Sequence, residues 1–156
     1  MSWQSITLNR SLGVYRAAWD ELNLRYYGGH PFLDSRFTET LLRHFGTNSE
    51  QLFIHRTRNA IDGLVILRAR GRGVWQQFVP HQLQTSPLLI PDFKLIDSLF
   101  GALPLNAWSI ELMNQDPEYF PPGLTEDASR CCVLPHALTM NISLKGDFDT
   151  YWDGRS

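Results

Sequence analysis

The sequence predicts a mixed α+β fold in which a mainly antiparallel sheet carries helices on both faces. Segments 52–55, 63–67 and 74–79 are mostly apolar and are separated by short turns, which is typical of an antiparallel meander. The middle segment is apolar at consecutive positions, Leu64-Val65-Ile66-Leu67, which indicates a strand covered on both sides. Helical periodicity occurs before and after the meander, so helices are available for each face.

Length and composition predict a single folded domain. The chain has 156 residues, of which 43% are hydrophobic and 19% are charged, and its nine Phe, five Trp and five Tyr exclude a disordered chain. Its net charge of −2 gives no general attraction to nucleic acid or to an anionic membrane. No signal-peptide pattern and no long apolar run occurs, so we expect a cytoplasmic protein without membrane insertion.

The first third of the chain predicts a strand and two helices. Residues 5–9 alternate as a strand does, and 11–13 offer a cap for a helix over 14–22. The segment 27–31 ends that helix, and Asp34 or Ser35 would cap a second helix that ends at Gly46. The apolar faces of the two helices comprise Tyr15, Trp19, Leu22, Phe37, Leu41, Leu42 and Phe45.

The part of the chain after the meander predicts one more helix and two strands. Residues 83–91 resemble a loop, and 92–103 a helix with an apolar set. Residues 107–112 alternate with period two, which predicts a strand with Trp108, Ile110 and Leu112 on one face. The turn-rich segment 114–126 predicts a loop or short helix, and 138–144 a last strand.

One motif resembles a cofactor loop. The run Arg68-Ala69-Arg70-Gly71-Arg72-Gly73 fits the pattern R-x-x-G-x-G with which GNAT acetyltransferases hold the pyrophosphate of acetyl-CoA. Its candidate cofactor-binding residues are Arg68, Arg70, Gly71, Arg72 and Gly73. That chemistry requires a helix after the glycines, whereas 74–79 predicts a strand, so the alternative is a hairpin turn with exposed arginines. Both interpretations stay open at this point.

No other pattern assigns a catalytic or metal-binding residue. The five histidines show no H-x-x-x-H spacing, and no G-x-S-x-G nucleophile pattern occurs. The adjacent Cys131 and Cys132 are expected to be reduced thiols, because a bridge between neighbours would be strained. We therefore expect no metal site, and the catalytic residues remain unassigned.

Three groups of segments, taken in order, resemble a known family. The first is Trp19-Asp20-Glu21-Leu22 followed by 31–34 and a helix ending at Phe45-Gly46, and the second is the hairpin 52–67. The third is 108–112, followed by 138–144 and 147–152. Together they resemble the N-terminal lobe of acetyltransferase-like proteins associated with cellulose and envelope polysaccharide biosynthesis. These proteins form a FemAB-like branch of the GNAT superfamily.

The resemblance implies a domain division and a function. Residues 1–146 would form the GNAT-like N-terminal lobe, and 147–156 would begin the junction to a second lobe that this sequence does not contain. The second lobe would hold most of the catalytic machinery and the acyl-CoA co-substrate, with no covalently bound cofactor. This half would face a small-molecule or saccharide acceptor and be inactive alone. The alternative is a non-catalytic module that binds a partner protein or a saccharide.

Overall fold

The computed structural model describes residues 2–58, 60–80, 86, 88–104 and 106–115, together with positions 132, 134 and 152. Two sequence predictions fall outside these residues: the strand over 138–144 and, apart from position 152, the junction over 147–156. Most of the predicted loop over 114–126 also lies outside them.

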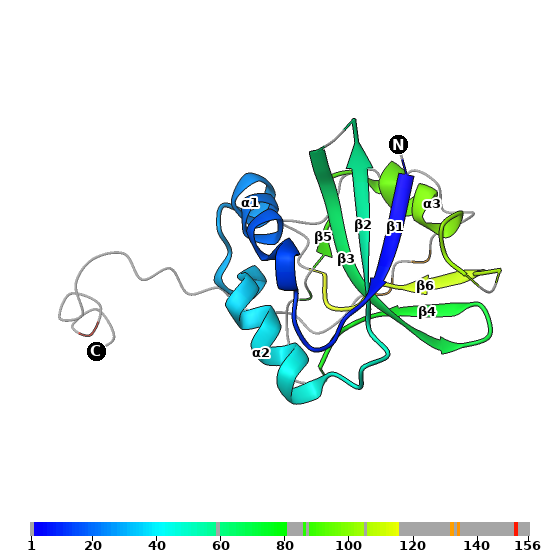
Figure 1. The fold of residues 1–156 in the computed structure, drawn as a ribbon, viewed down its shortest axis with the longest axis horizontal. Coiled ribbons are helices and arrows are strands. Elements are labelled where there is room, and N and C mark those ends of the chain that lie inside the picture. The colour runs from blue at the N-terminus through cyan, green and yellow to red at the C-terminus, as the bar shows by residue number, and fades with distance from the viewer. Residues whose placement is uncertain are drawn as a thin grey trace.

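The centre of the fold is a six-stranded sheet with the order β1-β2-β3-β4-β6, and β5 pairs with β3 beside this path. All pairs are antiparallel except β4 and β6, which run parallel. Figure 1 shows α1 and α2 beside one face of the sheet and α3 on the other side. The predicted α+β class, with a mainly antiparallel sheet and helices on both faces, is confirmed. The strands are β1 (Ser2–Thr7), β2 (Gln51–Thr57), β3 (Ala60–Gly71), β4 (Val74–Gln77), β5 (Leu88–Leu89) and β6 (Ser109–Glu111).

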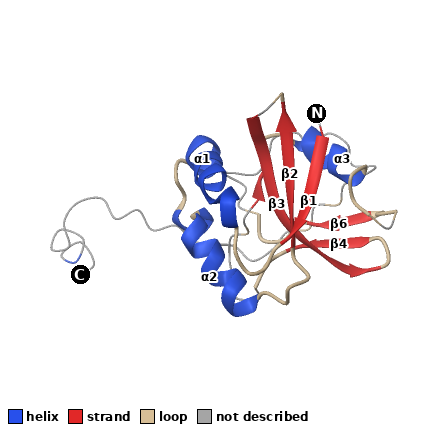
Figure 2. Cartoon of the chain, viewed as in Figure 1, coloured by secondary structure: helices blue, strands red, loops and turns tan. Residues whose placement is uncertain are grey.

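The three predicted helices are present, and their ends carry the expected signals (Figure 2). Asp34 caps α2, since its carboxylate accepts a hydrogen bond from the backbone N–H of Arg36 at 2.8 Å. Helix α1 ends at Gly28, whose φ of 63° is the left-handed conformation that glycine adopts without strain. The helices are α1 (Arg16–Tyr27), α2 (Ser35–Phe45) and α3 (Phe93–Phe100), with short 3₁₀ turns η1 (Gly13–Tyr15) and η2 (Pro31–Leu33).

The sheet separates two hydrophobic clusters, because alternate residues of its strands point to opposite faces. The cluster under α1 and α2 contains Trp19, Leu22 and Leu42 against Ile54 and Ile66. The cluster under α3 contains Phe53, Val65 and Trp75, with Ile96 and Leu99 of the helix. This arrangement explains the continuous apolar run of β3: each of its two faces is buried by a different helix layer.

Two residues of the predicted apolar faces are exposed. Phe45 is the last residue of α2 and is 51% exposed. Trp108 is 72% exposed, because β6 begins only at Ser109 and the indole lies over the β3–β4 turn.

In the described part of the chain, no helix has the length and apolar character needed to cross a membrane.

Candidate functional site

The predicted cofactor motif forms a hairpin turn. Strand β3 extends to Gly71, and β4 begins at Val74 and pairs back onto β3. Gly73 has a φ of 71°, which a tight turn requires and which side chains disfavour. A strand, not a helix, therefore follows the glycines, and the hairpin interpretation of the motif is confirmed.

The arginines of this hairpin already contact groups of the protein. Nη1 of Arg70 donates to Oε2 of Glu111 at 2.9 Å, and Nη2 of Arg68 lies 3.4 Å from Oε1 of Gln76, a long contact. Arg72 is exposed on the turn. The structure thus brings Arg68 and Arg70 to one face beside a carboxylate. Phosphate binding by Arg68, Arg70 and Arg72 with Gly71 and Gly73 stays a prediction.

The close packing of the β3–β4 turn against Trp108 can be tested at Gly73. A Cβ on Gly73 would lie 2.5 Å from Cδ1 of Trp108 and 3.0 Å from the backbone oxygen of Asn106. We expect Gly73→Ala to lower the free energy of unfolding by about 2 kcal/mol, through the left-handed φ and the displaced indole. Urea denaturation would measure the loss. Gly71→Ala is the matched control, because open space surrounds that position. Equal effects at the two glycines would contradict the packing described.

Polar side chains gather where the parallel strands β4 and β6 end. Nε2 of Gln115 donates to Oε1 of Gln77 and to the backbone oxygen of Met113, both at 2.7 Å. The hydroxyl of Ser86 donates to the same Met113 oxygen at 2.6 Å. Gln76, on the opposite face, directs its Nε2 to Sδ of Met113 at 3.0 Å. We call Gln76, Gln77, Ser86, Met113 and Gln115 the strand-end cluster.

The strand-end cluster contains a buried donor without a partner. Gln77 is 0% exposed, and its Nε2 makes no hydrogen bond, although its Oε1 is occupied by Gln115. The oxygen and nitrogen of Gln77 are assigned unambiguously, because Gln115 must use its own Nε2 to reach the Met113 carbonyl. Nε1 of Trp75, two residues earlier on the same face, is likewise buried and unpartnered. Leaving such a donor without an acceptor costs about 1–3 kcal/mol, which makes the strand-end cluster the candidate site.

The sequence contains one signal for this cluster, which its motifs did not reveal. In Trp75-Gln76-Gln77-Phe78 the period of a strand places Gln77 on the same face as Trp75, which is a core position. An amide at a core position requires a partner, and such a position marks a candidate site. Ser86 and Gln115 carry no such local pattern, since turns of the chain bring them to β4.

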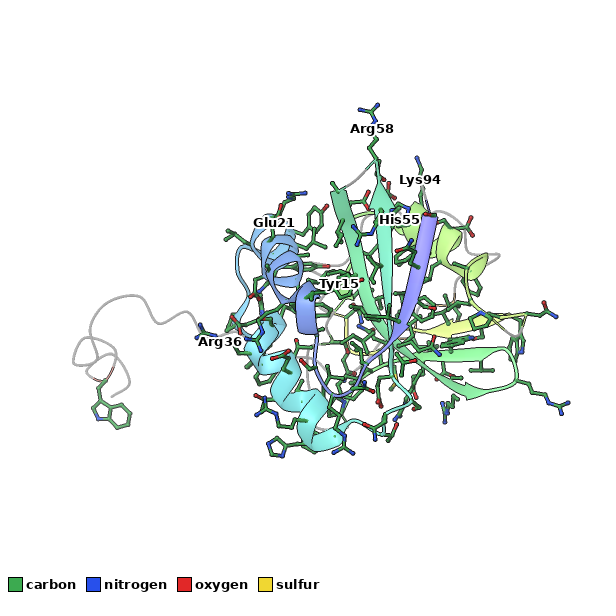
Figure 3. All side chains as sticks on the ribbon, viewed as in Figure 1. Tyr15, Glu21, Arg36, His55, Arg58 and Lys94 are labelled. Carbon is green, nitrogen blue, oxygen red and sulfur yellow. The ribbon has the colours of Figure 1, made fainter. Side chains whose placement is uncertain are left out.

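A second polar pair lies at the other end of the sheet. The imidazole of His55 is buried and donates from Nδ1 to Oδ1 of Asp62 at 2.6 Å, and the Trp3 ring covers it at a centroid distance of 5.0 Å. Burial raises the pKa of Asp62, but hydrogen bonds from Thr57 and His55 and the charge of His55 outweigh it, so the pKa lies below its usual range. Figure 3 shows Arg58 projecting from the β2–β3 turn at this end.

The His55–Asp62 pair is enclosed, because the imidazole is buried and covered by the Trp3 ring. The indole of Trp3 is held over it by a hydrogen bond from Nε1 to the Ser98 hydroxyl at 2.8 Å, and that hydroxyl donates to the Leu95 carbonyl. The Ser98 hydroxyl therefore accepts one hydrogen bond from the indole and donates one within α3. The pair ties β1, the β2–β3 hairpin and α3 together. Across the described ranges, no group of three or more His, Cys, Asp or Glu side chains is placed to hold a metal ion.

Among solved structures, comparison finds a weak likeness to a probable acetyltransferase. No protein-family model and no curated protein sequence matches the chain. A solved structure described as the crystal structure of a probable acetyltransferase is 16% identical and has a TM-score of 0.41. The match covers 93% of this chain and 100% of that one. A likeness at this level carries no argument about activity, so the function must be inferred from the residues themselves.

Proposed function

We propose that this chain is the acceptor-binding lobe of a GNAT-like acyltransferase of the FemAB type, with the acyl-CoA donor bound by a second lobe. The unpartnered amide nitrogen of Gln77 in the strand-end cluster is the observation that carries the proposal. It lies at the carboxyl ends of the parallel pair β4 and β6, where open sheets commonly place ligands. The mixed sheet with helices on both faces is compatible with this class of enzyme.

The chemistry of the cluster favours a neutral acceptor. Gln77, Ser86 and Gln115 offer amide and hydroxyl groups, and the free donors of Gln77 and Trp75 would hold a carbonyl or hydroxyl oxygen of the acceptor. A saccharide or another compound rich in hydroxyl and amide groups has such oxygens. This agrees with the envelope-related acceptor that the family resemblance implies.

The reaction would be a direct transfer from the thioester. A hydroxyl or amine of the acceptor attacks the thioester carbonyl carbon, a tetrahedral intermediate forms, and the carbon–sulfur bond breaks to release CoA as its thiolate. The acceptor's proton passes to a general base of the other lobe. The strand-end cluster would hold the acceptor in line with the thioester carbonyl. Such positioning is worth several powers of ten in rate.

Replacement of Gln77 tests the proposal. We expect Gln77→Leu to bind N-acetylglucosamine, used as a probe of the acceptor class, at least tenfold more weakly than the unaltered chain in a titration followed by NMR. The variant should be equally stable or up to about 1 kcal/mol more stable, since it removes a buried unsatisfied donor. Gln4→Leu, at an exposed glutamine, is the control. Equal binding by the two variants would contradict the assignment of Gln77.

The location of the acyl-CoA site has a separate test. We expect calorimetry of this chain with acetyl-CoA to show no stoichiometric binding. Tight binding would refute the division of roles between two lobes without affecting the assignment of Gln77.

The second candidate is a non-catalytic binding module for a saccharide or a partner protein. The composition of the strand-end cluster favours it, because its members are two glutamines that meet through their amides, a third glutamine, a serine and a methionine, with no base to activate a nucleophile. Acyl transfer to the probe by the protein that contains both lobes would decide against it. Binding of the probe without turnover would support it.

A further inference from the structure

Strand β1 is an outer strand of the sheet. Its residues Ser2–Thr7 pair with β2 on one side, and Figure 1 shows it at the end of the row β3, β2, β1. Ser2, Gln4, Ser5 and Thr7 are exposed, and Trp3 and Ile6 are half-buried. An outer strand offers backbone N–H and C=O groups along its free side, which a further strand can bind.

The free backbone groups can be identified from the register. The N–H of Leu8 donates to the Glu50 carbonyl at 2.9 Å, so at this position the backbone of the β1 segment faces β2. In an antiparallel pair such positions alternate, so Ile6, Gln4 and Ser2 also face β2. The N–H and C=O groups of Trp3, Ser5 and Thr7 therefore point away from the sheet. Within the described ranges, none of them has a backbone partner.

The free side of β1 lacks the usual protection against pairing. Outer strands are normally blunted by a lysine, a proline, a bulge or extreme shortness. The six residues Ser-Trp-Gln-Ser-Ile-Thr contain no charged residue and no proline, and the pairing of β1 with β2 is continuous without a bulge. The outer strand at the opposite end, β6, has only three residues.

We propose that β1 pairs antiparallel with β1 of a second copy of this chain, about a two-fold axis centred on Ser5. In this register Ser5 lies opposite Ser5 of the second copy, and Trp3 lies opposite Thr7. All the outward N–H and C=O groups of these residues then form hydrogen bonds in the pattern of an antiparallel ladder. Because the two-fold is perpendicular to the sheets, equivalent faces of the two molecules adjoin each other.

The composition of β1 favours a second copy as the occupant. At the two-fold axis Ser5 lies beside its own equivalent, so a charged residue at this position would repel itself. The strand is neutral at all six positions although 19% of the chain is charged. The contact is small, so the dimer should form at roughly 10–100 µM.

Sedimentation of the purified chain over a concentration series tests the proposal, which does not depend on the proposed function. We expect a monomer–dimer equilibrium in the unaltered chain. Ser5→Lys, which places two like charges at the axis, and Ser5→Pro, which removes the central donor, should each weaken the dimer at least tenfold. Thr40→Lys, an exposed position on α2, should leave it unchanged. Circular dichroism would verify that each variant is folded.

Disulfide trapping tests the register itself. Residues of a hydrogen-bonded antiparallel pair have Cα atoms about 5.5 Å apart, within the range that a disulfide spans. With Cys131 and Cys132 replaced by serine, Ser5→Cys should yield a covalent dimer on oxidation, and Thr40→Cys should not. A chain that stays monomeric at millimolar concentration overturns the proposal. Binding of an extended peptide to β1 would not rescue it. A dimer that Ser5→Lys leaves intact overturns it as well.

Discussion

Trp19→Ala should lower the free energy of unfolding by about 3–5 kcal/mol, one of the largest losses expected from a single substitution in this chain. The side chain is 0% exposed and lies between α1, η2 and the sheet. Its Nε1 also donates to the Leu33 carbonyl at 2.8 Å, and that carbonyl would lose its partner. Because a domain of this size is stable by about 5–15 kcal/mol, this loss would remove a large share of the stability.

Urea denaturation followed by far-ultraviolet circular dichroism would measure this loss. Leu24→Ala is the matched control on the same helix, because Leu24 is 68% exposed and should cost less than about 0.5 kcal/mol. Trp19→Phe separates the two contributions, since it keeps an aromatic ring and removes the hydrogen bond to Leu33. A loss below 1 kcal/mol for Trp19→Ala would mean that α1 does not pack on the sheet as described.

The elements that the sequence predicted correctly are those specified by local chemistry. Asp34 caps α2 because a carboxylate there satisfies a backbone N–H of the first turn, and this requirement is visible in the sequence. The continuous apolar run of β3 likewise predicted burial on both faces, and both hydrophobic clusters use it. These features depend on neighbours within a few residues.

The errors occurred where distant segments decide the outcome. Alternation over 107–112 predicted that Trp108 shares one strand face with Ile110 and Leu112. The parallel pairing with β4 starts only at Ser109, and Ile110 and Leu112 pack against the cluster under α3 while Trp108 is exposed. Nε1 of Trp108 donates instead to the Arg72 carbonyl at 3.2 Å, a residue of another hairpin. Phe45 is a similar case, because helical periodicity does not show which turns of a helix have other elements packed against them.

The candidate site was harder to predict than the fold for a related reason. The arginine–glycine motif of 68–73 matched a known pattern, yet the matching residues form a turn whose arginines contact Gln76 and Glu111. The strand-end cluster has no motif, because Ser86, Gln77 and Gln115 approach one another only in the folded chain. The buried amide at Gln77 was the only signal within the sequence.

Glu39→Ala should lower the free energy of unfolding by about 2–4 kcal/mol. Glu39 is 3% exposed in the middle of α2, where its carboxylate accepts hydrogen bonds from the Ser11 hydroxyl at 2.8 Å, the Leu12 N–H at 3.0 Å and the Arg16 guanidinium. It thereby anchors the segment between β1 and α1. The substitution leaves the buried N–H of Leu12 without an acceptor, whereas the half-exposed Arg16 can return to water. Thermal and urea denaturation at neutral pH would measure the loss.

The same carboxylate makes stability depend on pH. Burial raises the pKa of Glu39. The hydrogen bonds from Ser11, Leu12 and Arg16 and the charge of Arg16 lower it by more, so the pKa in the folded state lies below that in the unfolded state. Its contribution is therefore complete above the unfolded pKa and is lost as the pH falls through the folded pKa. We call the fall of the unfolding free energy at low pH the acid limb. Glu39→Gln should flatten the acid limb, and a smaller dependence on pH should remain because the pKa of Asp62 is also lowered.

The control for Glu39 is a glutamate–arginine pair at the surface. Glu21 pairs with Arg25 one turn later on α1, and both side chains are about half exposed or more. Such pairs contribute less than about 1 kcal/mol, because water and salt screen the charges. Glu21→Gln should therefore leave both the stability at neutral pH and the acid limb nearly unchanged. If both substitutions flattened the acid limb equally, the carboxylate of Glu39 would not be the group that couples folding to pH.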